Sequence, residues 1–115
     1  MQNEEAKIII PSLFKYEVLK TATILEEDLK KPFELLTHFL EAGVEVKEVN
    51  FQILEIVKKI ILNGSIKSGF PSFYDAIYHA IAISEKATFI TADKKYFAKV
   101  NGFNNIVLLN ESLFH

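Results

Sequence analysis

Residues 73–97 read FYDAIYHAIAISEKATFITADKKYF and alternate a helical pattern with a strand pattern. The largely apolar segment at 72–87 predicts a helix, and TFITA (88–92) is a short apolar run typical of a buried strand. A shorter helix is predicted at 93–102, and NIVLL (105–109) has the composition of a last strand. The order helix, strand, helix, strand favours parallel strands that are joined by helical crossovers.

The first half of the chain repeats this alternation. Its apolar and turn patterns predict strands at 7–11 and 44–49 and helices at 12–27, 31–43 and 50–64. The last of these helices begins with Asn50 as an N-cap and is expected to bury one stripe of apolar side chains, namely Phe51, Leu54, Val57 and Ile61. We therefore expect a single α/β domain over residues 1–115, built around a mostly parallel sheet.

The composition limits the classes of protein that the chain can form. It has 115 residues, half of them hydrophobic, a net charge of −2 and no cysteine, which fits one globular domain without disulfides or thiolate metal sites. No apolar run reaches about 18 residues and the start of the chain is acidic, so we expect no membrane span, no secretory signal and a cytoplasmic location. All 13 basic side chains are lysines, so any phosphate must be held by lysines, backbone amides or a metal ion.

Three carboxylates lie where a metal ion could bind. Asp93 directly follows the predicted strand at 88–92, Asp75 lies in the first turn of the helix at 72–87, and Glu17 is about one turn into the helix after the first strand. Ligands of parallel α/β domains bind beyond the carboxyl ends of strands, near helix N-termini. We therefore expect the three acids to converge on one rim, an arrangement that suits Mg²⁺ or Mn²⁺.

Each acid also has a purely structural interpretation. Ser72 and Asp75 have the spacing of a capping box, and Asp93 could cap the short helix that follows it. Glu17 could pair with Lys20, one turn later, on a solvated edge of its helix. A capping carboxylate can still offer its second oxygen to a metal ion, so the two roles are compatible.

Taken together, IIIPSLFKYEVLK (8–20) and the stretch at 73–97 resemble the PIN-domain ribonucleases, and among these the VapC-type toxins of prokaryotic toxin–antitoxin pairs. The resemblance implies a three-layer α/β/α fold with a mostly parallel sheet. It also implies that Glu17, Asp75 and Asp93 are catalytic residues that hold Mg²⁺ or Mn²⁺ for the hydrolysis of RNA phosphodiesters.

The resemblance extends to neighbouring residues and to partners. Thr91 matches a hydroxyl residue that often precedes the last acid, where it would position Asp93 or a water, and Ser72 would support the site through its cap. Lys94 and Lys95 could meet RNA phosphates, although ordinary solvated helix surface is the interpretation we favour for both. The implied partners are RNA, a cognate antitoxin protein and a second copy of the chain, in a homodimer that could exchange a strand, with no membrane involved.

One part of the family pattern does not match this sequence. The family normally opens with an apolar strand that ends in an aspartate, whereas only MQNEEAK (1–7) precedes the first predicted strand here. We therefore expect the first, central strand and its metal-binding aspartate to be missing, as in an N-terminally truncated domain. The comparison leaves an alternative function, a catalytically inactive remnant or fragment that acts as a protein- or RNA-binding module. For His79, one turn after Asp75, a packing role is favoured over a contact with the metal site.

Overall fold

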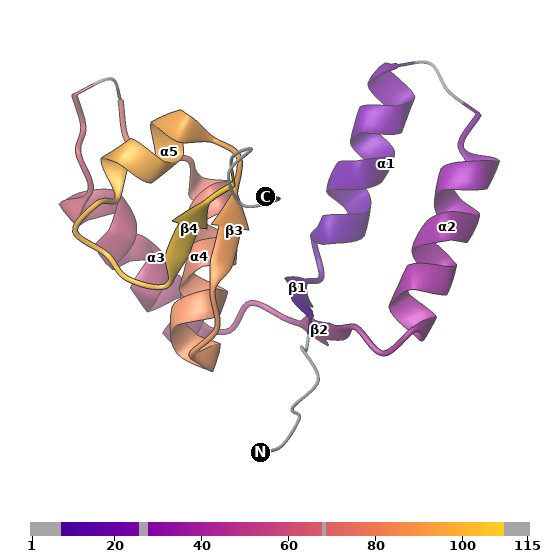
Figure 1. Cartoon of the computed structure of the whole chain (residues 1–115), viewed down its shortest axis with the longest axis horizontal. Helices are drawn as coiled ribbons and strands as arrows, with labels where there is room; N and C mark the ends of the chain where they lie inside the picture. Colours follow the sequence, from indigo (N-terminus) through magenta and orange to yellow (C-terminus); the bar gives the residue numbers. More distant parts are fainter. Residues whose placement is uncertain (1–7, 26–27, 68, 110–115) are drawn as a thin grey trace. The chain divides into compact units, whose positions relative to one another are not determined.

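In the computed structural model the chain divides into two compact units, the N-terminal unit Met1–Glu48 and the C-terminal unit Val49–His115 (Figure 1). The structure describes residues 8–25, 28–67 and 69–109. Two predicted segment ends, Lys7 of the first strand and residues 26–27 of the first helix, lie outside the described residues.

The N-terminal unit joins two short strands through two helices. Its elements are β1 (Ile9–Pro11), α1 (Phe14–Ile24), α2 (Lys30–Glu41) and β2 (Glu45–Lys47). The strands run parallel with Ile10 opposite Val46, and the rings of Phe14 and Phe39 pack α1 against α2 with centroids 5.9 Å apart. Gly43 follows α2 with a φ of 98°, so a residue without a Cβ ends this helix where the sequence predicts.

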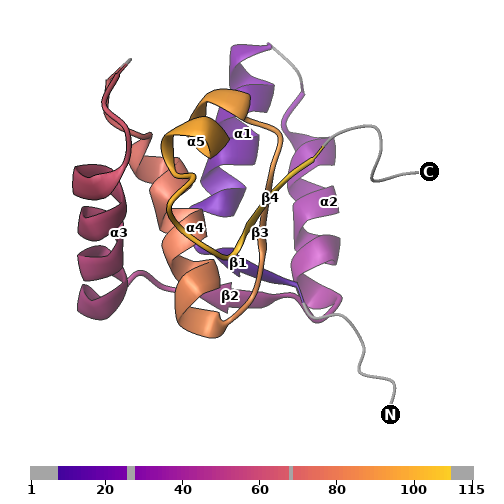
Figure 2. The same cartoon turned by 60° about the vertical axis from the view of Figure 1, so that its left-hand side comes forward.

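The C-terminal unit packs two helices against a second parallel strand pair. Its elements are α3 (Phe51–Asn63), α4 (Phe73–Glu85), β3 (Phe89–Thr91), α5 (Lys94–Lys99) and β4 (Ile106–Leu108). Ile90 of β3 lies opposite Val107 of β4, and the chain crosses between these strands through α5. Figure 2 shows α3 and α4 side by side, and their contact buries much of the apolar core, which includes Ile53, Val57, Ile60, Ala76, Ile77, Ala80 and Ile81.

The buried face of α3 differs from the predicted stripe. The structure buries Ile53, Val57 and Ile60, whereas Phe51 is 74% and Leu54 42% exposed. The prediction is therefore right for Val57 and wrong for Phe51 and Leu54. Hydrophobic periodicity locates a broad apolar arc on a helix, but packing against α4 selects the side of that arc that is covered.

The predicted fold class is confirmed. The chain has a mixed α/β fold with helices and short parallel strands, and the described strands form the pairs β1–β2 and β3–β4, one in each unit. Every strand and helix that the sequence predicts is present within the described ranges. No helix of this part of the chain is long and apolar enough to cross a membrane.

Among the four glycines, Gly64 has the least room for a side chain, which gives a first prediction. A Cβ at Gly64 would lie 2.7 Å from Cγ of Pro71, 2.9 Å from the carbonyl oxygen of Ile60 and 3.0 Å from that of Lys99. Two of these atoms belong to the backbone, and the Lys99 carbonyl already accepts the Ser65 N–H at 2.8 Å. We expect Gly64→Ala to lower the free energy of unfolding by about 1–3 kcal/mol, measured by urea denaturation.

Gly102 provides the matched control for this substitution. A Cβ there meets nothing within 4 Å. Gly102→Ala should therefore change the free energy of unfolding by less than about 0.5 kcal/mol, as substitutions at open surface positions do. Equal effects of the two substitutions would contradict the packing argument.

Candidate functional site

Asp75 lies in the first turn of α4, where the serine that precedes the helix caps it. Ser72 has extended backbone angles, φ −61° and ψ 130°, and its hydroxyl accepts the Asp75 N–H at 3.3 Å. The serine half of the predicted capping box is therefore present. The Asp75 carboxylate is half-buried at the positive end of a helix, a position that stabilises negative charge.

Asp93 lies directly beyond β3 and is the N-cap of α5. Its Oδ1 atom accepts the Tyr96 N–H at 3.0 Å, and its own N–H donates to the Thr91 hydroxyl at 3.1 Å. Thr91 is buried and Asp93 is exposed. The threonine thus fixes the backbone of the acid from inside the strand, and the cap uses one carboxylate oxygen of Asp93.

Tyr96 connects this cap to the interior of the C-terminal unit. Its hydroxyl lies 2.8 Å from Nδ1 of His79, and Nε2 of His79 lies 2.7 Å from the carbonyl oxygen of Asn104. A carbonyl oxygen can only accept, so Nε2 carries the proton of the neutral ring. Nδ1 is then an acceptor, and the Tyr96 hydroxyl donates to it. The packing role that the sequence favours for His79 is the one found, with two specific partners.

The electrostatics of this group agree with a neutral imidazole. Burial lowers the pKa of His79, and the hydrogen bond with Asn104 opposes that effect in part. Burial also raises the pKa of Tyr96, and the negative charge of Asp75 raises it further. The backbone N–H of the same tyrosine donates to Asp93.

The remaining predicted site residues are Glu17, Lys94 and Lys95. Glu17 is half-buried in the first turn of α1 and belongs to the N-terminal unit, so its convergence with Asp75 and Asp93 stays a prediction. Lys94 and Lys95 are exposed at the start of α5, directly after Asp93.

The donor set suits a hard cation, although it forms no complete metal site. Within residues 8–25, 28–67 and 69–109, no three His, Asp or Glu side chains come together in a group that could hold a metal ion. Mg²⁺ commonly binds through one or two carboxylates and keeps its other positions for water or phosphate. The oxygen donors of Asp75 and Asp93 fit that chemistry, with Glu17 as the proposed third.

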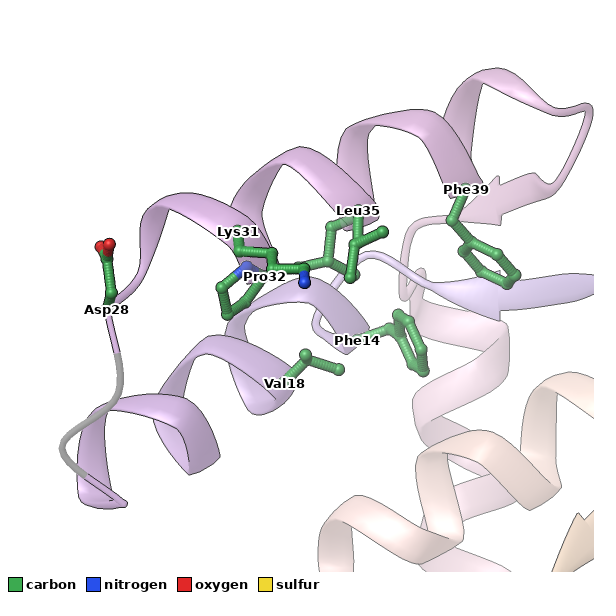
Figure 3. Close-up of a pocket in the computed structure, with 8 residues that line it drawn as sticks. Phe14, Val18, Asp28, Lys31, Pro32, Leu35 and Phe39 are labelled. Atoms are coloured by element: carbon green, nitrogen blue, oxygen red, sulfur yellow. The ribbon is translucent and has the colours of Figure 1, made fainter.

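The N-terminal unit contains a different kind of cavity, an apolar groove of about 710 Å³ between α1 and α2. Figure 3 shows Phe14, Val18 and Leu35 along this groove, with Asp28 and Lys31 towards one end. Glu17 is not among the lining residues. The lining is almost entirely apolar, so the groove suits a hydrophobic segment rather than a phosphodiester.

Sequence reasoning did not identify Tyr96 and Asn104 as parts of the site. Tyr96 resembles an ordinary apolar residue of a short helix, and Asn104 contributes only its backbone carbonyl, which no residue type reveals. The available signal was the histidine itself, because a fully buried imidazole needs partners for both ring nitrogens. His79 is 0% exposed, and both of its partners come from residues 17 or more positions later.

The fold and these acids define the class of the protein as an α/β domain with an acidic candidate site beyond the end of a parallel strand. A family model described as the PIN domain matches residues 2–102, and the chain therefore belongs to the PIN-domain family. PIN domains are generally nucleases that act on RNA or DNA and typically depend on a divalent metal ion, which supports a nuclease role for this chain. No match to a curated protein was found.

The lowered pKa of His79 predicts how stability depends on pH. In the unfolded chain the imidazole takes up a proton near its ordinary pKa of 6.5, whereas the folded protein resists protonation. The unfolded state therefore binds more protons as the pH falls below that value, and the folded state loses stability. We expect the free energy of unfolding to fall by up to about 1.4 kcal/mol per pH unit between about pH 6.5 and the lower pKa of the folded state.

Urea denaturation at a series of pH values tests this expectation against His79→Gln. Glutamine can accept from Tyr96 and donate to Asn104, but it does not titrate, so its slope should be flatter. Ile60→Val serves as a control because it removes one buried methylene and leaves every titratable group in place. Equal slopes for the parent protein and His79→Gln would show that His79 does not carry the pH dependence.

Proposed function

We propose that this protein is a metal-dependent endoribonuclease of the VapC type, which hydrolyses RNA phosphodiesters at a carboxylate-held Mg²⁺ or Mn²⁺ site. Membership of the PIN-domain family supports the nuclease role. The observation that carries the proposal is that Asp75 and Asp93 lie at the starts of two helices of one unit, α4 and α5, and that a buried hydrogen bond between His79 and Tyr96 joins these helices. The proposed partners are RNA, a cognate antitoxin and a second copy of the chain, with an exchanged strand as one way to form the dimer.

In this proposal Asp75, Asp93 and Glu17 hold the metal ion. When bound, Mg²⁺ or Mn²⁺ supplies charge neutralisation at the scissile phosphate and lowers the pKa of a coordinated water. The protein's own contribution is placement. The Ser72 cap fixes the first turn of α4 under Asp75, and the Thr91 hydroxyl and the Tyr96 N–H hold Asp93 at its backbone and at one carboxylate oxygen. These bonds orient the acids before substrate binds, which reduces the reorganisation needed during the reaction.

The first test is cleavage of a single-stranded RNA by the purified chain with Mg²⁺, with Mn²⁺ and with EDTA. Asp75→Asn and Asp93→Asn should abolish cleavage, because an amide is a poor ligand for a hard cation. The free energy of unfolding of both variants should stay within about 1 kcal/mol of the parent, because asparagine can replace Asp93 as the N-cap of α5 and Ser72 still caps α4 in Asp75→Asn. Glu17→Gln tests the third acid in the same way.

Glu55→Gln is the matched control, an exposed acid on α3 of the same unit. It should leave cleavage unchanged. Cleavage that survives EDTA and Asp75→Asn would rule out the metal-site proposal. A folded parent protein that cleaves no RNA under any metal would instead point to the alternative of an inactive binding module.

The two exposed lysines at the start of α5 give a separate prediction for RNA binding. If Lys94 and Lys95 each contact a phosphate, Lys94→Ala/Lys95→Ala should weaken binding and reduce the slope of log affinity against log salt by about 0.7 per contact. Fluorescence anisotropy with the Asp75→Asn protein measures binding without cleavage. The control is Lys58→Ala/Lys59→Ala, an equally exposed adjacent pair on α3. Equal slopes for the two pairs would mean that the α5 lysines are ordinary surface.

A further inference from the structure

The most unusual feature of the C-terminal unit is a buried polar pair inside an aromatic cluster. His79 is 0% and Tyr96 2% exposed. Their rings meet edge to face with centroids 5.8 Å apart, and Phe89 lies 6.0 Å from each of them. Phe103 lies 6.1 Å from the histidine ring. Nothing about filling this space requires polar atoms, because apolar side chains of similar size would pack there as well.

Both ring nitrogens of His79 and the Tyr96 hydroxyl have hydrogen-bond partners, so the pair forms a specific polar contact. The Tyr96 hydroxyl donates to Nδ1 of His79, and Nε2 donates to the Asn104 carbonyl. No buried side-chain nitrogen or oxygen among the described residues lacks a hydrogen-bond partner. Such a bond has a preferred length and direction, whereas contacts between apolar groups do not, so it fixes how two elements meet.

The two elements that meet here are the ones that carry the acids. His79 lies one turn after Asp75 on α4, so the two side chains share a face of that helix. Tyr96 lies three residues after Asp93 and donates its backbone N–H to that carboxylate. One hydrogen bond therefore ties the start of α5 to the first turns of α4.

We propose that the buried Tyr96–His79 hydrogen bond is a positioning element that sets the separation and orientation of Asp75 and Asp93 for a shared divalent cation. This inference rests on the proposed function. His79 and Tyr96 are positioning residues in it and touch neither the cation nor the RNA. The element acts in the first half of α5, whereas the bond from the Ser65 N–H to the Lys99 carbonyl holds the end of this six-residue helix.

The test separates positioning from packing with a double variant. Tyr96→Phe alone leaves Nδ1 of His79 buried without a donor and should destabilise the protein. Tyr96→Phe/His79→Leu removes both polar groups and restores an apolar fit, which is often nearly neutral for stability. If the pair only packs, the double variant should bind metal like the parent. If it positions the acids, both variants should bind metal weakly.

The measured quantity is the Kd for Mn²⁺ alone, by isothermal titration calorimetry, with urea denaturation on each protein. We expect Mn²⁺ affinity to fall about 10-fold or more in Tyr96→Phe and in the double variant, the range found for residues that orient metal ligands. His79→Gln preserves a donor and an acceptor and should bind Mn²⁺ close to the parent value. Ile60→Val, an unrelated core substitution, should leave the Kd unchanged whatever its effect on stability.

The outcomes distinguish this inference from the function on which it rests. If the parent binds Mn²⁺, Asp75→Asn and Asp93→Asn do not, and the double variant binds as the parent does, the positioning role is overturned and the metal site stands. If the parent binds no Mn²⁺ at all, the metal site fails and the positioning role fails with it. A weakened double variant that unfolds at the same urea concentration as the parent supports the proposal.

Discussion

The C-terminal unit depends on a neutral histidine that is completely buried between two helices. A buried imidazole is tolerated only when both ring nitrogens are paired, and each pairing here reaches a different segment of the chain. One bond holds Tyr96 of α5, and the other holds the Asn104 carbonyl just before β4. The histidine therefore joins α4 to the crossover helix and to the last strand. These two bonds add to the pairing of β4 with β3 and to the bond from the Ser65 N–H to the carbonyl of Lys99 in α5.

For the two acids of this unit, a structural role is compatible with the proposed chemical role. Ser72 caps α4 with Asp75 in its first turn, and Asp93 itself caps α5. A cap needs one oxygen acceptor at a helix N-terminus, and the positive end of the helix also stabilises negative charge. Asp93, at the start of the short helix that follows β3, therefore presents its carboxylate at the place where ligands of parallel α/β folds bind. The capping interpretation does not compete with the metal-site proposal, because it explains why the acids are held rigidly.

Much of this arrangement could be predicted from local sequence. The caps at Asn50, Ser72 and Asp93 follow from residue type and position, and periodicity located the helices and strands. The predictions that fail, or that the sequence does not allow, depend on contacts between residues that are far apart in the sequence. Phe51 and Leu54 were assigned to the buried stripe of α3, but the side of the apolar arc that is covered depends on α4. The partners of His79 lie 17 and 25 residues away, and one of them is a backbone carbonyl, so no residue pattern identifies it.

Local capping bonds and long-range contacts have different consequences for the proposed site. Local capping bonds orient each carboxylate relative to its own helix, and the residues beside each acid specify that orientation. The separation between the acids depends on how α4 meets α5, which local sequence does not specify and which the Tyr96–His79 bond constrains. A cation is sensitive to that separation, because coordination distances tolerate changes of only about 0.2 Å. An acidic site of this kind can thus keep every ligand and every cap and still lose its function through a buried residue that touches neither metal nor substrate.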